Sequence, residues 1–208
     1  MAAAHDSESK TTVAGHGWWL IGLGLAVMVL LWLGGDIVQS SLRYDRERIV
    51  HGEYWRLITG HWVHGGLRHM SLNVLGALVI AFLFARTYSV RQWLLILFAS
   101  LLAIDVGFLS LMPQLGWYVG ASGVLHGFLA AGAIVWWRTE SRIMACALSA
   151  IVVGKLAWEQ WQGALPISGD MPVIVDAHLY GAVGGVLAAA GIECANWLSH
   201  SKAKQAPL

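Results

Sequence analysis

Long stretches without a charged residue are the feature that most constrains this chain. Residues 106–137 contain no Asp, Glu, Lys or Arg, and a helix of about 20 apolar residues is enough to cross a bilayer. Of the 208 residues, 57% are hydrophobic and 12% are charged, whereas about a quarter of the residues of a soluble domain are charged. The sequence therefore predicts a polytopic membrane protein and excludes an ordinary soluble domain. A net charge of +1 also argues against a nucleic-acid partner.

The expected fold class is all-α, a bundle of six transmembrane helices. The apolar segments are too long for membrane strands and do not alternate with polar residues. Pro113 and the glycines after it divide the long uncharged stretch into two spans. The six expected spans cover residues 18–38, 69–86, 92–112, 122–138, 142–162 and 176–197. Residues 39–68 are expected to fold at the outer interface, residues 1–17 to form a disordered cytoplasmic tail, and residues 199–208 to form a second cytoplasmic tail.

Basic residues predict which end of the bundle faces the cytoplasm. Arginine or lysine residues occupy the connections after the second and fourth spans and the tail after the sixth span. With six spans these positions all lie on one side, which is therefore expected to be cytoplasmic. The arginine-rich loop 39–68 is contrary evidence, and we interpret it as a folded segment on the outer side.

Polar residues that open three of the expected spans are the candidate functional groups, because polar side chains inside a membrane are costly. His69 and Asn73 begin the second span, Ser122 begins the fourth, and His178 begins the sixth. These spans run in the same direction, so the four residues are expected at one depth, just inside the outer leaflet. Small residues at four-residue spacing predict close contact between the fourth and sixth spans. They are Gly123, Gly127, Ala131, Gly181, Gly185 and Ala189.

This contact would bring His178 toward Ser122. An imidazole within hydrogen-bond reach activates a serine hydroxyl as a nucleophile. His69 and Asn73, one turn apart, could donate hydrogen bonds to an oxyanion, together with the backbone N–H groups at the start of the fourth span. The pair has no third carboxylate, because Asp176 lies two residues before His178 and so on another face of the helix.

The chain resembles the rhomboid intramembrane serine proteases in three stretches: WRLITGHWVHGGLRHMSLN (residues 55–73), GASG (120–123) and AHLYGAVGG (177–185). The resemblance implies a Ser122 nucleophile, a His178 base and acid, and an oxyanion hole of His69, Asn73 and the Ser122 N–H. Several further residues match the family's supporting or substrate-adjacent positions. They are His64 at the head of the second span, Gly120 and Gly123 beside the nucleophile, the loop pair Trp55 and Arg56, and His126, where many rhomboids carry a tyrosine that packs on the catalytic histidine.

Three further stretches, GASGVLHG, KLAWEQ (155–160) and DAHLYGA (176–182), resemble the rhombosortases of Gram-negative bacteria. This resemblance implies a protein of the bacterial inner membrane, with its active site open toward the periplasm. The implied partners are membrane lipid and exported proteins that end in a Gly-Gly motif, an apolar span and a basic tail. It implies no cofactor and no metal. The alternatives are a general rhomboid protease and a non-catalytic rhomboid-like binding protein.

For several polar residues the sequence leaves two possible roles open. Asp105 either faces an internal aqueous cavity or bonds neighbouring helices. Lys155 and Glu159 form a mutually neutralising pair or take part in gating the substrate. A zinc site from His61, His64 and His69 is disfavoured, because no Cys or carboxylate completes it at short spacing.

Overall fold

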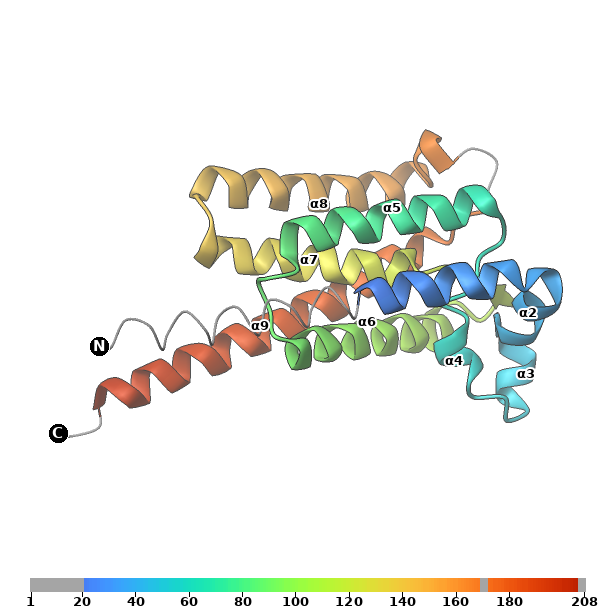
Figure 1. The fold of residues 1–208 in the computed structure, drawn as a ribbon, viewed down its shortest axis with the longest axis horizontal. Coiled ribbons are helices and arrows are strands. Elements are labelled where there is room, and N and C mark those ends of the chain that lie inside the picture. The colour runs from blue at the N-terminus through green and yellow to red at the C-terminus, as the bar shows by residue number, and fades with distance from the viewer. Residues whose placement is uncertain (1–20, 169–171, 206–208) are drawn as a thin grey trace.

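The computed structural model describes residues 21–168 and 172–205, and these are mostly helical (Figure 1). The long helices are α5 (Leu67–Phe84), α6 (Val90–Leu111), α7 (Ser122–Thr139), α8 (Arg142–Gln162) and α9 (Val175–Gln205). Helices α5, α7 and α9 run in one direction, and α6 and α8 run in the other (Figure 1). The starts of α5, α7 and α9 therefore lie at the same end of the bundle. The expected tail 1–17 and the first residues of the first span lie outside the described residues.

Large apolar side chains cover the outside of the long helices. Phe82 on α5, Ile143 on α8 and Leu187 on α9 are all exposed, as expected for helices that present this surface to lipid. Among the described residues, α5, α6, α8 and α9 are long and apolar enough to span a membrane, and the bent helix pair Ile21–Leu33 and Gly35–Leu42 would make a fifth span. The chain is thus an all-α, multi-pass membrane protein, while the count of six spans stays a prediction.

Helix α7 packs among the other four long helices and has a lower mean hydropathy than they have. It packs against α5, α6, α8 and α9, and its buried positions are mainly small residues such as Gly127, Ala130 and Ala131. A helix that other helices surround does not have to match the lipid, so it can carry Ser122 and His126. With 18 residues α7 is long enough to cross a membrane, and its enclosure by other helices explains why its mean hydropathy is lower than that of α5, α6, α8 and α9.

The predicted end of the first span, which was expected to cover residues 18–38, is wrong. The helical segment Ile21–Leu33 stops at a glycine pair, and α2 (Gly35–Leu42) continues at an angle of 115°. Gly35 has a φ of +63°, in the left-handed region that glycine adopts without a steric penalty. The chain can therefore turn sharply at this point, between the apolar segment that ends at Leu33 and the polar Asp36.

The segment between α2 and α5 folds into short elements that are tied to the rest of the bundle. It contains α3 (Arg46–Val50), α4 (Arg56–Thr59) and the strand β1 (Tyr44–Asp45), which pairs antiparallel with β2 (Trp117–Tyr118). This two-residue ladder is an exception to the expectation that strands are unlikely. Pairing with β2 fixes the segment against the chain that leads directly to Ser122.

Arg46 fastens this folded segment to the end of α6. Its guanidinium donates hydrogen bonds to the carbonyls of Phe108, Met112 (2.9 Å) and Leu115 (3.1 Å). The last carbonyls of a helix have no partner within the helix, so one side chain both satisfies these groups and joins two parts of the chain.

A second correction concerns the C-terminal end. The last span was expected to finish at residue 197 and to be followed by a tail, but α9 continues as one helix to Gln205. The residues after Trp197 include Lys202, Ala203 and Lys204, which are good helix formers, and nothing in this stretch breaks the helix.

Arg56 is the most buried charged side chain of the described residues, with 2% of its surface exposed. Its Nε donates to Glu53 at 2.6 Å, and its Nη1 donates to the carbonyls of Ser40 and Arg43 at 3.1 and 2.9 Å. We expect Arg56→Ala to lower the free energy of unfolding by about 2–4 kcal/mol, because buried acceptors would lose their donors. Unfolding in detergent would measure this loss. Arg48→Ala is the matched control, because its pair with Glu53 is exposed and is worth about 0–1 kcal/mol. An equal effect of the two changes would contradict the assignment.

Candidate active site

Ser122 and His178 lie within hydrogen-bond distance across two helices. Ser122 is the first residue of α7, and its Oγ is 2.9 Å from Nε2 of His178, in the first turn of α9. Ser122 is half-buried and His178 is 5% exposed. Residues separated by more than fifty positions therefore meet through the packing of α7 on α9.

Glycines on both helices make this contact possible. A Cβ added at Gly181 would collide with the carbonyl of Gly123, and one at Gly185 would collide with the carbonyl of Gly127. A Cβ at Gly123 would lie 2.8 Å from the carbonyl oxygen of Ala177. The sequence predicted this contact from four-residue spacing, and the structure has it at the same glycines.

The loop before Ser122 is held by backbone contacts that a side chain would disturb. Gly120 has a φ of +122°, its N–H donates to the carbonyl of Gly60 at 3.1 Å, and its carbonyl accepts from the hydroxyl of Tyr118 at 2.7 Å. A Cβ at Gly120 would lie 2.5 Å from Nε2 of His69. His69 therefore lies directly against the backbone that leads to Ser122.

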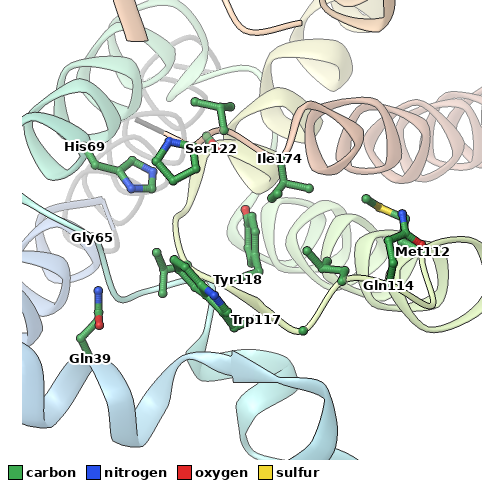
Figure 2. A pocket seen from close by; sticks show the side chains of 14 residues that line it. Gln39, Gly65, His69, Met112, Gln114, Trp117, Tyr118, Ser122 and Ile174 are labelled. Atoms are coloured by element: carbon green, nitrogen blue, oxygen red, sulfur yellow. The ribbon is translucent and has the colours of Figure 1, made fainter. Parts of the chain in front are cut away.

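A cavity of about 460 Å³ has both His69 and Ser122 in its wall. Figure 2 shows these two residues at one side of the cavity, with Met112 and Gln114 at the opposite side. The side chains in between are largely apolar and include Trp117. Asn73 is buried one turn further along α5, where its Nδ2 donates to the carbonyl of His69 at 3.1 Å.

His126 stacks on His178, as the position of an aromatic residue in related proteins suggested. The ring centroids are 4.1 Å apart, and the planes differ by 14°. Its Nδ1 donates to the carbonyl of Ser122 at 2.7 Å, within the same helix. This bond holds the His126 ring in place as a platform for His178.

Glu159 is the site residue that sequence reasoning missed, because it was considered only as a partner of Lys155 or as part of a gate. The pair exists, with Lys155 Nζ 2.7 Å from Oε1 of Glu159. However, Oε2 of Glu159 lies 2.9 Å from Nδ1 of His178. The expectation of a Ser–His pair without a third carboxylate is therefore wrong. The sequence did hold a signal for this contact. Glu159 lies near the end of the fifth expected span, which is at the same depth as the first turn of the sixth span with His178.

The remaining polar candidates make contacts that support the fold around the site. Asp105 lies 3.5 Å from Nε2 of the buried His61, which supports the reading of Asp105 as a group that bonds neighbouring segments. His64 packs edge-on against His69, with ring centroids 5.1 Å apart. Trp55 is half-exposed, and among the described residues neither Trp55 nor Arg56 lines the cavity.

His64 gives a pH prediction. Burial, and next the neighbouring His69, lower the pKa of His64 from 6.5 to about 4. The unfolded chain therefore takes up a proton at a higher pH than the folded protein, so stability is complete above pH 6.5 and is lost as the pH falls toward 4. We expect a loss of up to about 3 kcal/mol from this group. Unfolding in detergent at several pH values, compared with His64→Phe, would measure it; an identical pH dependence in the two proteins would refute the assignment.

Comparison with known proteins agrees with this architecture. Residues 51–193, more than half of the chain, match the model of the Rhomboid domain. The chain is 26% identical to YdcA of Bacillus subtilis (strain 168) over 171 residues, which is 78% of this chain and 83% of that protein. It is 27% identical to the rhomboid protease GluP of the same organism over 71% of this chain, and 32% identical to RHOMBOID-like protein 4 of Arabidopsis thaliana over 51% of it. These alignments cover only 28% and 25% of the two longer relatives.

The chain therefore belongs to the rhomboid family. Within this class of membrane-embedded proteins it is a rhomboid serine protease, a hydrolase that acts on transmembrane substrates within the membrane.

Proposed function

We propose that Ser122 is the nucleophile and His178 the general base and acid of this protease. The observation that carries the proposal is the 2.9 Å contact between Ser122 Oγ and His178 Nε2 beside a cavity. The imidazole accepts the hydroxyl proton as Oγ attacks the scissile carbonyl, and later gives the proton to the leaving amine. Water then hydrolyses the acyl-enzyme, or an amine takes the acyl group in its place.

His69, Asn73 and the N–H of Ser122 stabilise the oxyanion in this proposal. His69 lines the same cavity as Ser122, and the N–H of the first residue of a helix has no partner within the helix. Asn73 holds the carbonyl of His69 and keeps one amide hydrogen for this role. A donor of this kind contributes about 2.7–4 kcal/mol to lowering the barrier. His64 packs against His69 and His126 stacks on His178, so both support the site. Gly120 leaves room for the ring of His69, and Gly123 leaves room for the backbone of α9 beside Ser122.

We further propose that the substrates are exported proteins with a C-terminal Gly-Gly motif, an apolar span and a basic tail, as the rhombosortase-like stretches imply. A peptide bond inside a transmembrane helix is protected by the helix's own hydrogen bonds, so the substrate must unwind before it is cleaved. Each glycine makes a helix less favourable by about 0.8–1 kcal/mol relative to alanine. A Gly-Gly pair therefore lowers the cost of presenting an extended backbone to Ser122.

The same proposal places the protein in the bacterial inner membrane with the site toward the periplasm. The site is at the start of α5, α7 and α9, while Arg86, Arg91, Arg138 and Arg142 lie in the connections at the opposite end. Cytoplasmic loops carry the excess of basic residues, so the opposite end faces outward. In this arrangement the Lys155 and Glu159 end of α8 also faces outward.

A reporter protein with a Gly-Gly motif, an apolar span and a basic tail tests the proposal in proteoliposomes. We expect the wild-type protein to release the reporter and Ser122→Ala to release none. Ser100→Ala is the matched control, because the Ser100 hydroxyl donates to the carbonyl of Ile96 within its own helix and Ser100 does not line the cavity. Release by Ser122→Ala at the wild-type rate would refute the nucleophile. Equal release of a reporter with Leu-Leu in place of Gly-Gly would refute the substrate class and leave a general rhomboid protease.

A further inference from the structure

The imidazole of His178 is held through both of its nitrogens. Nε2 lies 2.9 Å from Ser122 Oγ, and Nδ1 lies 2.9 Å from Oε2 of Glu159. Glu159 comes from α8 and His178 from α9, so the second contact joins two helices near the end of the bundle where the site lies. His178 and Glu159 are 5% and 3% exposed, so water does not weaken this hydrogen bond as it would at a surface.

The contact with Glu159 decides which nitrogen of His178 carries the proton. An ionised carboxylate can only accept a hydrogen bond. In the neutral ring Nδ1 therefore donates to Glu159, and Nε2 is left as the acceptor that faces the hydroxyl of Ser122. This is the tautomer that a general base requires, and an imidazole without such a partner distributes its proton between both nitrogens.

Lys155 balances the charge of Glu159 from the opposite side. Its Nζ lies 2.7 Å from Oε1 of Glu159, and its side chain is 26% exposed, whereas that of Glu159 is 3% exposed. Each carboxylate oxygen therefore has its own partner, the outer one Lys155 and the inner one His178. A buried charge is costly in a membrane helix. If Glu159 served only to neutralise Lys155, its Oε2 would not need to point into the bundle toward His178.

His126 supplies a different constraint on the same ring. Its stacking on His178 fixes the plane of the imidazole but does not determine which nitrogen is protonated. The ligand atoms of His126, Glu159 and His178 lie within 4.8 Å of one another. However, Nδ1 of His126 already bonds the carbonyl of Ser122, and two stacked rings direct their nitrogens along nearly parallel planes. Hydrogen bonds therefore explain these contacts better than a shared ion.

We propose that Glu159 is a positioning residue that, with Lys155 behind it, holds His178 in the tautomer that activates Ser122. This inference rests on the proposed function, in which His178 removes the proton of Ser122. The Oγ–H bond breaks as Oγ bonds to the substrate carbonyl carbon, and the proton goes to Nε2. Nδ1 keeps its own proton, and Glu159 stays ionised and stabilises the imidazolium. The Nε2 proton then goes to the leaving amine, so Glu159 neither gains nor loses a proton.

The test compares Glu159→Gln with a double variant, Lys155→Met with Glu159→Gln, in the proteoliposome assay. The double variant removes both charges and so leaves no unpaired ion in the bundle. We expect both variants to fold and to lower kcat at least about 100-fold with little change in KM, because the corresponding change in a soluble triad costs about 10,000-fold. Glu193→Gln is the control, since Glu193 pairs with Arg138 away from the site and its loss should leave kcat unchanged.

Two readouts separate positioning from a merely structural or gating role. A small serine-directed fluorophosphonate does not need a gate, so its rate of reaction with Ser122 should fall in parallel with kcat. The ¹⁵N spectrum of His178, assigned by difference with His178→Ala, should change from the Nδ1–H form to a mixture of tautomers. Wild-type labelling with a raised KM would indicate a gate and overturn the inference. Recovery of kcat in the double variant would show that Glu159 only neutralises Lys155 and would overturn it as well.

The outcome for Ser122→Ala keeps this inference distinct from the proposed function. If Ser122→Ala remains active, the proposed function fails. If Ser122→Ala is inactive while Glu159→Gln keeps wild-type kcat, labelling rate and ¹⁵N spectrum, the catalytic pair stands and only the role of Glu159 is refuted.

Discussion

Replacing His178 with alanine is expected to lower kcat about a millionfold while the bundle stays folded. Removal of the base from a serine-protease triad costs about 2 × 10⁶ in kcat, because the hydroxyl loses the group that takes its proton. The fold should survive, since the glycine contacts between α7 and α9 do not involve the imidazole and Glu159 keeps its pair with Lys155. The reporter assay in proteoliposomes measures kcat, and thermal unfolding in detergent measures stability.

His51→Ala is the control for this change. His51 is exposed at the end of α3, and its ring bonds the carbonyl of Glu47 within that short segment. We expect wild-type kcat from this variant. If His178→Ala, still folded, kept more than about a hundredth of the wild-type kcat, the assignment of His178 as the base would be wrong.

The second large effect is expected at Gly181, where α9 meets α7. A single methyl group at this position would collide with the backbone carbonyl of Gly123, and backbone yields less than a flexible side chain. Overpacking of this kind costs about 1–3 kcal/mol or more. Because Gly123 directly follows Ser122, separation of the helices would also lengthen the contact with His178. We expect Gly181→Ala to lose both stability and most of its activity.

Gly191→Ala on the same helix provides a matched control. A Cβ at Gly191 has open space around it, so the only change is the better helix propensity of alanine, worth up to about 1 kcal/mol. This variant should be as stable as the wild type or slightly more stable, and fully active. Thermal unfolding and the reporter assay on both variants would show the difference, and equal behaviour at the two glycines would contradict the packing that we describe.

The helices and the meeting of Ser122 with His178 could be predicted because both follow from local patterns. Apolar stretches predict helices starting at residues 92 and 142, and the structure has them starting at Val90 and Arg142. Small residues at four-residue spacing predict that α7 and α9 touch, and the collisions at Gly181 and Gly185 show this contact. These signals act within one or two turns of helix and need no knowledge of distant residues.

The two features that could not be predicted, the short β ladder and the contact of Glu159 with His178, both depend on pairings between distant segments. The ladder of Tyr44 with Tyr118 has only two residues on each side, too few for an alternating pattern. Glu159 has an obvious partner one turn away in Lys155, which hides its second partner on another helix. A carboxylate has two oxygens and can serve two neighbours, so one satisfied pair in the sequence does not exhaust its contacts.

The central claim is that packing of α7 on α9 makes Ser122 a nucleophile activated by His178. The most direct measurement is the reaction of the folded membrane protein with a serine-directed fluorophosphonate, with the adduct mapped by mass spectrometry. We predict an adduct on Ser122 in the wild type and in Ser100→Ala, none at this position in Ser122→Ala, and a much slower reaction in His178→Ala. An unmodified Ser122 in the folded wild type, or an equal rate without His178, would contradict the account.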